Sequence, residues 1–508
     1  MIFQTGLLRQ LTEAGLEVSV VVPDAKDPNL MALGERDGVS VVQFAQSLRP
    51  VDRFLKTIRK YLVEDIRKNP PLWDKHQELL GVGNGSGKRQ LLARFGLFLG
   101  DVVQRFPASR TAFLRWEKRI LLRDAEVAFV RNLAPDLLVS TYPVTVPEPG
   151  LLLAAQSLGI PTVLHLLSWD NITAKGHFQA LADDYIAWGP TMAEELKEFY
   201  GVEPQRITQC GVPHFDLYFG DNELPAEAGP LVQKLLKAPD PYLFFAMSAA
   251  RYAPCETDIL RQLCAATEAG GPLEGVRIVA RPHPSALGGV LNDTETLARL
   301  KELEAEAGLL VSYPDMTAGS RMNWSIRDTD MYELVYLLRG AAVVLNSGST
   351  VNVEALALGR PVVVTSFDGA EQRPYAKSAR RLKDYPHLRK LFADGGGEVT
   401  TNTEELLAAI TTFLNDPGFR AAERKYALQR QIGNQNGDAT GKVARTLQQL
   451  LLRNNEDQGN RKKPPPNPPH GGGLLKTLSV LGLKVSILPF LRLPCNEDLP
   501  STKTKNYG

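Results

Sequence analysis

Small and polar residues that follow an apolar run make the stretch from Leu345 to Pro361 the strongest candidate for chemistry. The run ends at Leu345, a small-residue turn follows, and Ser349 or Thr350 is placed to begin the next helix. Small residues let the backbone approach a ligand, and the amides and dipole of a helix start favour an anion such as a pyrophosphate. Glu354, one turn further on, is placed to accept hydrogen bonds from ribose hydroxyls. The alternative is an ordinary capped turn with an exposed glutamate.

A second candidate, Arg281-Pro282-His283-Pro284, directly follows the apolar run Val276–Ala280. The two prolines stiffen the loop and remove two backbone donors, so recognition there has to use the side chains of Arg281 and His283. A guanidinium and an imidazole at the end of a strand suit a phosphate group. The alternative is a rigid surface turn.

Dense polar residues also follow the apolar run that ends near Leu166, in the stretch 168–176. Such a loop suits the floor of a cleft. Asp170 is the candidate base, because an inverting transfer to a hydroxyl needs a group that accepts the proton. The acceptor-side candidates are Ser168, Trp169 as a stacking surface for a sugar, Asn171 and Lys175. The alternative is a capped loop with a packed tryptophan.

Weaker candidates follow the same logic of strand ends. Ser248 and Arg251 follow the first strand of the second half of the chain and are candidate phosphate contacts. Asp368 follows a later strand and either binds sugar hydroxyls or forms a turn. His214, in the stretch 211–216, is a second catalytic candidate, and it either faces a ligand or simply caps its segment.

Strand-like and helix-like segments alternate in the first part of the chain, which predicts a parallel sheet covered by helices on both faces. The expected strands are Val18–Val22, Val39–Phe44, Leu137–Ser140, Thr162–Leu166 and Tyr185–Trp188, with helices at Phe3–Ala14, Leu151–Leu158 and Thr191–Tyr200. A mainly helical stretch from about Leu48 to Arg131 interrupts them, and Lys and Arg outnumber Asp and Glu there two to one. Contact with an anionic membrane or lipid-linked acceptor is one interpretation of this stretch, and a solvated helix face is the other.

A second alternation begins after Gly211-Val212-Pro213. Its expected strands are Tyr242–Ala246, Val276–Ala280, Leu309–Ser312, Val343–Leu345 and Pro361–Val364, with helices at about Glu256–Ala269, Asp293–Ala307, Tyr332–Leu338, Val351–Leu358 and Gly418–Leu452. The sequence therefore predicts an α/β protein with two Rossmann-like domains, at 1–212 and 213–454, that face a central cleft. Ligands in such sheets bind at the carboxyl ends of the strands.

The segment 455–508 differs in composition. Arg461-Lys462-Lys463 leads into a proline-rich run and then into Gly471–Gly473, which predicts a disordered tail without a packed core. The apolar stretch Leu474–Leu493 contains Lys, Arg and Pro, which is poor for a membrane-spanning helix. A membrane-surface anchor is the alternative.

The composition is that of a folded protein, with 44% hydrophobic and 23% charged residues in a chain of 508. A net charge of +1 gives no case for nucleic-acid binding. The four cysteines lack metal-type spacing and fit a reducing compartment, and the first residues lack a secretory signal. We expect a cytoplasmic protein and leave open peripheral contact with the inner face of the plasma membrane.

These motifs resemble the donor-binding region of the GT-B glycosyltransferase superfamily, which includes the non-hydrolysing UDP-N-acetylglucosamine 2-epimerases and the CDP-glycerol glycerophosphotransferases. The stretch 168–176, the run Trp188-Gly189-Pro190-Thr191-Met192 and the Gly-x-Pro-x-Phe-Asp element at 211–216 resemble a subgroup of bacterial surface-polysaccharide transferases. The resemblance covers about Val18 to Leu452 in layout and is specific only in these patches.

The resemblance implies that 1–212 is the acceptor-side domain and 213–454 the donor-binding domain, and it implies roles for particular residues. The diphosphate-binding residues would be Ser347, Gly348, Ser349 and Thr350. Glu354 would hold the ribose, Arg281 and His283 would face the donor phosphates, and the element at 211–216 would be the interdomain hinge. One departure concerns the start of the first domain, because GT-B domains begin with a strand and a glycine-rich turn, whereas this chain begins on the helix that follows them. Either the true start lies upstream or the first sheet lacks a strand.

Two motif-like stretches are rejected. The stretch 81–89 resembles a P-loop, but its first required glycine falls on Val82, Arg89 follows the lysine and no strand precedes it. Asp328-Thr329-Asp330 matches the metal motif of the other main glycosyltransferase fold but precedes a helix, so helix capping explains it better. No His, Glu or Cys cluster has catalytic metal spacing, so we expect no metal and no cofactor besides the donor substrate.

The leading hypothesis is a metal-independent transfer of a sugar from a nucleotide-diphosphate sugar to a hydroxyl acceptor in cell-surface polysaccharide or glycolipid assembly. Arg281, His283 and the helix start at Ser349–Thr350 would neutralise the leaving diphosphate. The alternatives are a nucleotide-sugar 2-epimerase, a transferase of polyol phosphate from a CDP-alcohol, and a non-catalytic nucleotide-binding protein.

Overall fold

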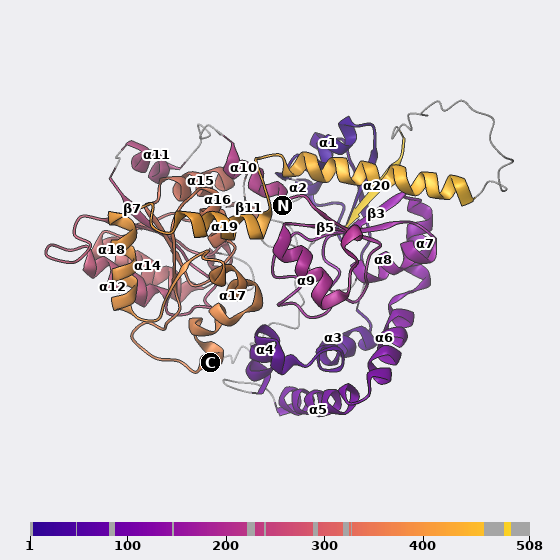
Figure 1. Cartoon of the computed structure of the whole chain (residues 1–508), viewed down its shortest axis with the longest axis horizontal. Helices are drawn as coiled ribbons and strands as arrows, with labels where there is room; N and C mark the ends of the chain where they lie inside the picture. Colours follow the sequence, from indigo (N-terminus) through magenta and orange to yellow (C-terminus); the bar gives the residue numbers. More distant parts are fainter. Residues whose placement is uncertain are drawn as a thin grey trace, which may run out of the picture. The chain divides into compact units, whose positions relative to one another are not determined.

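The computed structural model describes residues 4–46, 48–80, 87–144, 147–220, 229–237, 240–287, 293–317, 325–326, 328–461 and 482–488 (Figure 1). The chain divides into two compact units. Unit 1 contains the described residues of 1–220, 385–387 and 429–490, and unit 2 contains those of 221–384 and 388–428. This division differs from the expected domains at 1–212 and 213–454, because the end of the expected second domain groups with unit 1.

The described strands of unit 1 form one parallel sheet in the order β2-β1-β15-β3-β4-β5-β6. Its strands are β1 (Glu17–Val22), β2 (Ser40–Gln43), β3 (Leu137–Ser140), β4 (Thr162–His165), β5 (Asp184–Ala187), β6 (Ile207–Gln209) and β15 (Lys484–Leu488). Every residue of β3, β4 and β5 is buried, as expected for strands of a parallel sheet covered on both faces. The predicted Rossmann-like sheet is confirmed, and the five expected strands lie within two residues of their expected bounds, whereas β6 and β15 were not predicted.

Strand β15 corrects the expectation of a tail without a packed core. It lies between β1 and β3 and pairs with both in parallel, and four of its five residues are buried. The sequence analysis left open whether the first sheet lacks a strand, and a segment from the far end of the sequence lies in this sheet between β1 and β3. Composition over 455–508 is dominated by its proline and glycine runs, and it hides one short strand-like segment.

Helices surround the unit 1 sheet and also form the basic stretch predicted between residues 48 and 131. The helices are α1 (Leu7–Glu13), α2 (Pro28–Asp37), α3 (Pro50–Val63), α4 (Pro70–Leu80), α5 (Gly87–Gln104), α6 (Pro107–Leu121), α7 (Asp124–Leu133), α8 (Glu148–Ser157), α9 (Pro190–Tyr200), α10 (Asp216–Phe219) and α20 (Ala439–Arg461), with short 3-10 turns η2 (Ile66–Lys68), η3 (Pro204–Arg206) and η4 (Pro213–Phe215). Helix α8 packs its apolar face onto the sheet in one buried cluster, and α3 forms a second with α4 and α5.

The predicted single helix at about 418–452 is wrong, because two helices, α19 (Ala421–Ile432) and α20, occupy that range. Gly437, between them, has a φ of 85°, a conformation that L side chains rarely adopt, so the helix cannot continue through it. Asp216 then supplies the start of α20, since its two carboxylate oxygens accept from the amides of Ala439 and Thr440 at 2.8 Å. The aspartate of the Gly-x-Pro-x-Phe-Asp element thus acts as a helix cap.

The main sheet of unit 2 is also parallel, in the order β14-β13-β12-β7-β8-β9. Its strands are β7 (Tyr242–Ala246), β8 (Arg277–Arg281), β9 (Leu310–Val311), β12 (Val343–Asn346), β13 (Val362–Thr365) and β14 (Glu398–Thr400), and β10 (Met316–Thr317) and β11 (Ser325–Ile326) form a separate antiparallel pair. The second predicted Rossmann-like sheet is confirmed, and the expected strand bounds again agree within two residues.

The helices of unit 2 cover this sheet. They are α11 (Pro230–Lys237), α12 (Glu256–Ala266), α13 (Pro284–Leu287), α14 (Thr294–Ala307), α15 (Asp328–Gly340), α16 (Val351–Ala357), α17 (Pro386–Ala393) and α18 (Thr403–Asn415), with 3-10 turns η6 (Tyr375–Lys377) and η7 (Ala379–Asp384); α17 and α19 contribute residues to both units. Apolar residues of α12, α14 and α18 pack against β7, β8 and β12 in one buried cluster. This rigid support holds the loops at the carboxyl ends of the strands.

Candidate functional site

The two strongest candidate loops share one edge of the unit 2 sheet. Leu345 of β12 pairs with Phe245 of β7, and Phe245 pairs with Ala280 of β8, so the loops after β12 and β8 leave the sheet at the same level. Only β7 lies between them. Two strand spacings separate the two strand ends by roughly 10 Å. The turn 347–350 and the loop 281–284 are therefore neighbours along this edge.

The turn after β12 is held in shape by buried amide groups. The Oδ1 atom of Asn346 accepts from the amide of Gly348 at 2.7 Å, and the Nδ2 atom of Asn346 donates to Oδ1 of Asn352 at 2.5 Å. Gly348 has a φ of 119°, and a Cβ added there would lie 3.0 Å from Cδ1 of Leu388. Only glycine adopts this conformation without strain, so the sequence at 346–348 fixes the path of the turn.

Two backbone donors remain available at this turn. Among the described residues, neither the amide of Ser349 nor that of Thr350 has a hydrogen-bond partner, whereas the amide of Val351 donates to Oγ of Ser349 at 3.3 Å. Helix α16 starts at Val351, so these amides carry the positive end of its dipole. Glu354 lies in the first turn of the same helix and is largely buried.

A buried glutamate that the sequence analysis did not single out, Glu256, connects this turn to the loop after β7. Its carboxylate accepts from the amide of Ser248 at 2.8 Å and from Oγ of Ser347 at 2.7 Å. Ser347 is buried, and its Oγ also lies 2.9 Å from Oγ1 of Thr365. Burial raises the pKa of Glu256 to about 8, although the hydrogen bonds from the two serines act in the opposite direction. Ser347 and Ser248 therefore take part in an internal network that positions the edge.

Arg281 is also engaged inside the protein. Its Nη2 atom contacts both carboxylate oxygens of Asp330 at 2.6 Å, and its Nη1 atom donates to Oγ of Ser312 at 2.6 Å. Both Arg281 and Asp330 are buried. The charge that the sequence analysis offered to a phosphate is thus neutralised by Asp330, and Arg281 acts as a support for the loop.

His283 presents a hydrogen-bond donor at the same edge. The amide of Ser285 donates to Nδ1 of His283 at 3.1 Å, so in the neutral ring the proton is on Nε2. Burial lowers the pKa of His283, which keeps the ring neutral at pH 7. No described residue accepts a hydrogen bond from Nε2. This N–H group is suited to a phosphate oxygen.

The remaining candidates of unit 2 lie in loops that are linked to each other. Arg381, which is fully buried, donates to the carbonyl oxygen of Arg251 at 3.2 Å, while the side chain of Arg251 is exposed. Asp368 is buried, accepts from the amide of Arg373 at 3.0 Å and lies 3.5 Å from Nε of Arg380. The carboxylate of Asp368 therefore closes its own loop, which agrees with the turn interpretation of this residue.

The acceptor-side candidates of unit 1 cluster in the loop after β4. Asp170 forms an ion pair with Lys175 at 2.7 Å and accepts from Oγ of Ser168 at 2.5 Å. Burial alone would raise the pKa of Asp170, but Lys175, the nearby His387 and the hydrogen bonds outweigh it, so the pKa lies below its usual value. A carboxylate with a lowered pKa is a weaker base, so this geometry does not favour Asp170 as the proton acceptor.

Two aromatic rings pack behind this loop. Trp169 is buried and meets the ring of His387 edge-on, with 4.8 Å between ring centroids. Oγ1 of Thr173 lies 2.9 Å from Nδ1 of His387, whose pKa burial lowers to about 4. Asn171 is buried as well, and its Oδ1 has no partner within the part of the chain that the structure describes. Trp169 is therefore packed in the protein and offers no exposed face to a sugar.

His214 lies in an aromatic group. Its ring meets that of Phe215 at 4.6 Å and that of Trp188 at 6.0 Å, edge-on in both cases. Burial lowers the pKa of His214 to about 3, so the ring is neutral across the physiological range. These contacts match those of a packed histidine.

The rejected motifs have no new support. Most of the stretch 81–89 lies outside the described residues. Asp330, in the rejected acidic motif, is the ion-pair partner of Arg281. Within the described ranges no group of three His, Cys, Asp or Glu side chains could hold a metal ion, and none of the described helices has the length and apolar character needed to cross a membrane.

Three residues that hold the candidate loops were not predicted to do so: Glu256 and His387 were not singled out, and Asp330 was named only in the rejected acidic motif. Glu256 had a local signal, because it begins a helix eight residues after a strand-end serine. Asp330 and His387 had none, since their partners Arg281 and Thr173 lie 49 and 214 residues away in the sequence. Only the folded chain brings these pairs together.

Comparison with known proteins gives similarities of fold. No protein-family model and no curated protein matches the chain. Among solved structures, UDP-GlcNAc 2-epimerase from Neisseria meningitidis, bound to UDP-GlcNAc, has a TM-score of 0.44 at 14% identity and covers 85% of this chain and 100% of its own. A glycosyltransferase from Rickettsia africae has a TM-score of 0.43 at 11% identity and covers 89% and 96%.

The wall teichoic acid polymerase TagF has a TM-score of 0.39 at 12% identity and covers 63% of this chain and 73% of its own. These are the kinds of protein that the sequence motifs resemble. Similarities at this level do not decide the activity, which has to be argued from the residues of the site.

Proposed function

We propose that unit 2 binds the diphosphate of a nucleotide-linked donor and that the chain transfers a sugar from this donor to a hydroxyl group. The observation that carries the proposal is the shared sheet edge, where Nε2–H of His283 and the amides of Ser349 and Thr350 lie on loops separated by one strand. All three are hydrogen-bond donors without a partner among the described residues.

The chemistry of these donors fits a leaving diphosphate. The two amides stand at the start of α16, where the helix dipole favours negative charge. A neutral histidine adds one N–H donor without needing a proton from the solvent. Donors held in place by the turn at Gly348 need no rearrangement as negative charge develops on the leaving oxygen. Glu354, in the same helix, is the proposed ribose ligand.

Arg281, Ser347 and Asp368 receive supporting roles in this proposal. Arg281 holds its loop through Asp330, Ser347 connects the turn to Glu256, and Asp368 closes the loop after β13. The acceptor, a polysaccharide or glycolipid, rests on the motif resemblance, and the base is left unassigned because Asp170 is paired with Lys175.

Calorimetric titration with UDP, CDP and UMP tests the donor site. If His283 contacts the diphosphate, His283→Ala weakens UDP binding about tenfold, which matches the roughly 1.5 kcal/mol of one hydrogen bond to a charged group. The same change has a smaller effect on UMP. His283→Gln, whose amide carries an N–H near the position of Nε2, restores part of the affinity. Equal losses for UDP and UMP, or no binding of any nucleotide, would contradict the proposal.

Product analysis separates the possible activities. Transfer from a UDP-sugar to an added hydroxyl acceptor supports the proposed function. An epimer formed from UDP-N-acetylhexosamine without acceptor indicates the epimerase alternative, and turnover of CDP-glycerol indicates polyol-phosphate transfer. Tight binding of a nucleotide diphosphate without turnover of any donor indicates a non-catalytic binding protein.

A further inference from the structure

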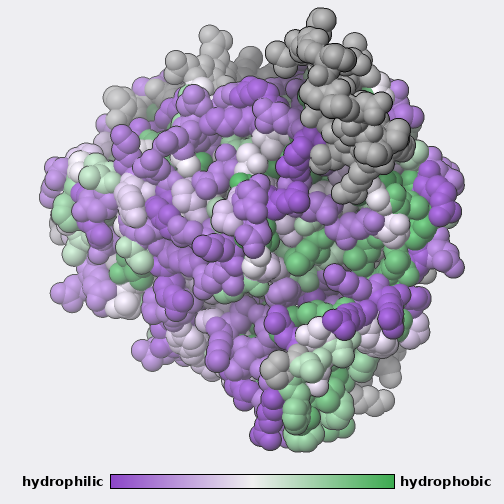
Figure 2. All heavy atoms as spheres, turned by 45° about the vertical axis from the view of Figure 1, so that its right-hand side comes forward, coloured by the Kyte–Doolittle hydropathy of each residue, from purple (hydrophilic) through white to green (hydrophobic). Residues whose placement is uncertain are grey.

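Helix α5 of unit 1 exposes a row of large apolar side chains. Leu91 is 70% exposed, Phe95 50%, Phe98 65% and Val102 38%, and Phe106, just after the helix, is 60% exposed. At 3.6 residues per turn, the four residues within the helix lie within roughly 60° of each other around its axis. Figure 2 shows hydrophobic residues gathered at the lower end of this view, the level at which α5 lies in Figure 1. We call these five residues the α5 stripe.

The opposite face of α5 is already used for packing. Ala93, Gly96 and Gly100 are buried, and a Cβ added at Gly96 or Gly100 would lie 2.6 Å or less from the nearest atom of Tyr61 in α3. These residues lie on the side of the helix axis away from the α5 stripe. The fold of unit 1 therefore fixes α5 with the stripe turned outwards, and no described part of the chain covers it.

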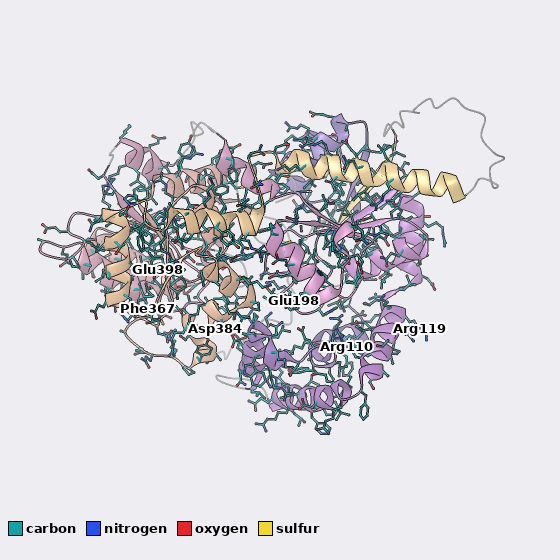
Figure 3. All side chains as sticks on the ribbon, in the orientation of Figure 1. Arg110, Arg119, Glu198, Phe367, Asp384 and Glu398 are labelled. Carbon is teal, nitrogen blue, oxygen red and sulfur yellow. The ribbon has the colours of Figure 1, made fainter. Side chains whose placement is uncertain are left out.

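Basic side chains surround this surface. Residues 87–123 contain nine Lys and Arg and two Asp and Glu, and one of the two acids, Glu117, is buried in an ion pair with Arg59. Arg94 on α5 and Arg105, which directly follows the helix, flank the stripe, and both are exposed. Helix α6 adds further exposed cations, which are Arg115, Lys118 and Arg119, and Figure 3 labels Arg119 among them. Trp116, also on α6, is 45% exposed.

An exposed apolar row beside clustered cations is unfavourable in water alone and marks an interaction surface. Phe, Leu and Trp next to Lys and Arg suit the boundary between the acyl chains and the anionic headgroups of a bilayer. We propose that α5 and α6 dock on an anionic lipid surface, with the α5 stripe inserted at the level of the headgroups. This inference does not depend on the donor site, because no residue of unit 2 takes part.

Vesicle sedimentation of the full chain tests the proposal. We expect the chain to sediment with vesicles of phosphatidylcholine that contain about 30% phosphatidylglycerol, and much less with phosphatidylcholine alone. Phe95→Ser/Phe98→Ser should lower the bound fraction about tenfold or more, since burial of aromatic side chains drives insertion. Arg94→Glu/Arg105→Glu should weaken binding to the anionic vesicles and reduce its dependence on salt.

A matched control removes equally exposed side chains elsewhere. Met31 in α2 and Tyr426 in α19 are 49% and 53% exposed, and Met31→Ser/Tyr426→Ser should bind vesicles as the unmodified chain does. All four residues that the two serine variants change are exposed, so melting curves should be unaltered. Failure of the unmodified chain to bind anionic vesicles overturns the proposal. So does a change from dimer to monomer in Phe95→Ser/Phe98→Ser without lipid, which would identify the stripe as an interface between two copies.

Discussion

Each unit buries a glutamate at the start of a helix that follows a strand, but the two glutamates join different parts of their sheets. Glu148 in unit 1 accepts from Oγ of Ser140 at 2.6 Å and from the amides of Thr141 and Tyr142 at 3.0 and 2.8 Å. Glu256 in unit 2 accepts from Ser248 and from Ser347, which follow two different strands. One carboxylate closes a single strand-to-helix connection, and the other fastens two connections together.

The contacts of Glu148 bear on the stability of unit 1 alone, whereas those of Glu256 also bear on the proposed binding site of unit 2. A local contact such as that of Glu148 can form as soon as β3 and α8 meet, and it orders only its own loop. The contact of Glu256 orders the turn that carries the amides of Ser349 and Thr350. We infer that the same buried group serves folding in unit 1 and also shapes the proposed donor site in unit 2.

The sheets differ in a second way. All strands of the unit 2 sheet come from one continuous stretch of the chain, whereas the unit 1 sheet takes β15 from the other end of the sequence. The carbonyl of Leu488 at the end of β15 accepts from Oγ1 of Thr141 at 2.8 Å, next to the loop that Glu148 closes. Unit 1 therefore depends on a remote segment for both its sheet and its loop.

Deletion of residues 462–508 should have the largest effect on this comparison. It removes the strand between β1 and β3 with the buried side chains of Val485, Ile487 and Leu488, which stabilise the fold by about 1.5–3 kcal/mol each. We expect unit 1 to lose at least about 5 kcal/mol and to exchange its amide hydrogens rapidly, while unit 2 keeps its protection. Hydrogen exchange followed by mass spectrometry resolves the two units.

Deletion of residues 489–508 alone is the matched control, because it leaves β15 in place. This shorter deletion should preserve the protection of β1 and β3. Equal protection of unit 1 in both deletion variants would show that the sheet does not need β15.

Removal of one partner from the buried ion pair of each unit should lower the free energy of unfolding by less than the deletion does, and by different amounts in the two units. Asp330→Ala leaves Arg281 with Ser312 as its remaining hydrogen-bond partner, so we expect a loss of about 3–5 kcal/mol in the free energy of unfolding. Glu117→Ala leaves Arg59 with the carbonyl oxygen of Phe178 at 2.8 Å and that of His177, so its loss should be smaller. Chemical denaturation measures both losses.

The double variant Arg281→Met/Asp330→Ala checks the cause. Removal of both charges takes away the unpaired buried cation, so the double variant should be more stable than Asp330→Ala. If the loss of unfolding free energy in the double variant equals the sum of the losses in Arg281→Met and Asp330→Ala, the two side chains do not interact as the geometry indicates.

The sequence predicts helices and strands better than it predicts which side chains contact each other. Tyr242–Ala246 and Leu137–Ser140 are recognisable because short β-branched and aromatic runs between turn residues identify buried strands. The turn 347–350 is recognisable because small residues between a strand and a helix are a local signal. For these features the information lies within about ten residues.

The role of Arg281 could not be predicted in the same way. A strand-end arginine looks identical in the sequence whether it faces a ligand or an aspartate, and its partner Asp330 lies 49 residues away. The position of β15 could not be predicted for the same reason. Lys484–Leu488 is strand-like by itself, but no neighbouring residue in the sequence indicates that it pairs with β1 and β3. Long-range pairing is set by packing of the whole sheet, which a single sequence does not display.

The pH dependence of stability gives the smallest and sharpest test of the two glutamates. Burial raises the pKa of Glu148 to about 7 and that of Glu256 to about 8, from 4.5. The folded state thus holds these protons more tightly than the unfolded state. The stability that the two protonated glutamates contribute is fully present below pH 4.5. It is lost as the pH rises through the folded pKa, which is about 7 for Glu148 and about 8 for Glu256. One pKa unit corresponds to about 1.4 kcal/mol, and relaxation reduces the cost of a buried charge, so we expect each glutamate to contribute on the order of 2 kcal/mol.

Glu148→Gln and Glu256→Gln remove these two steps separately, since glutamine resembles the protonated acid. The pH dependence of the thermal unfolding temperature should become flatter between about pH 5 and 7 in the first variant and between about pH 5 and 8 in the second, so only the second variant changes the interval from 7 to 8. The separate fall in stability that buried histidines such as His387 cause should remain in both variants, because its lowered pKa of about 4 makes stability fall as the pH drops below the usual 6.5. Only Glu256→Gln should also change the affinity for UDP, because only Glu256 contacts the turn at Ser347. A similar change of affinity in Glu148→Gln would mean that the two glutamates do not differ in the way their contacts indicate.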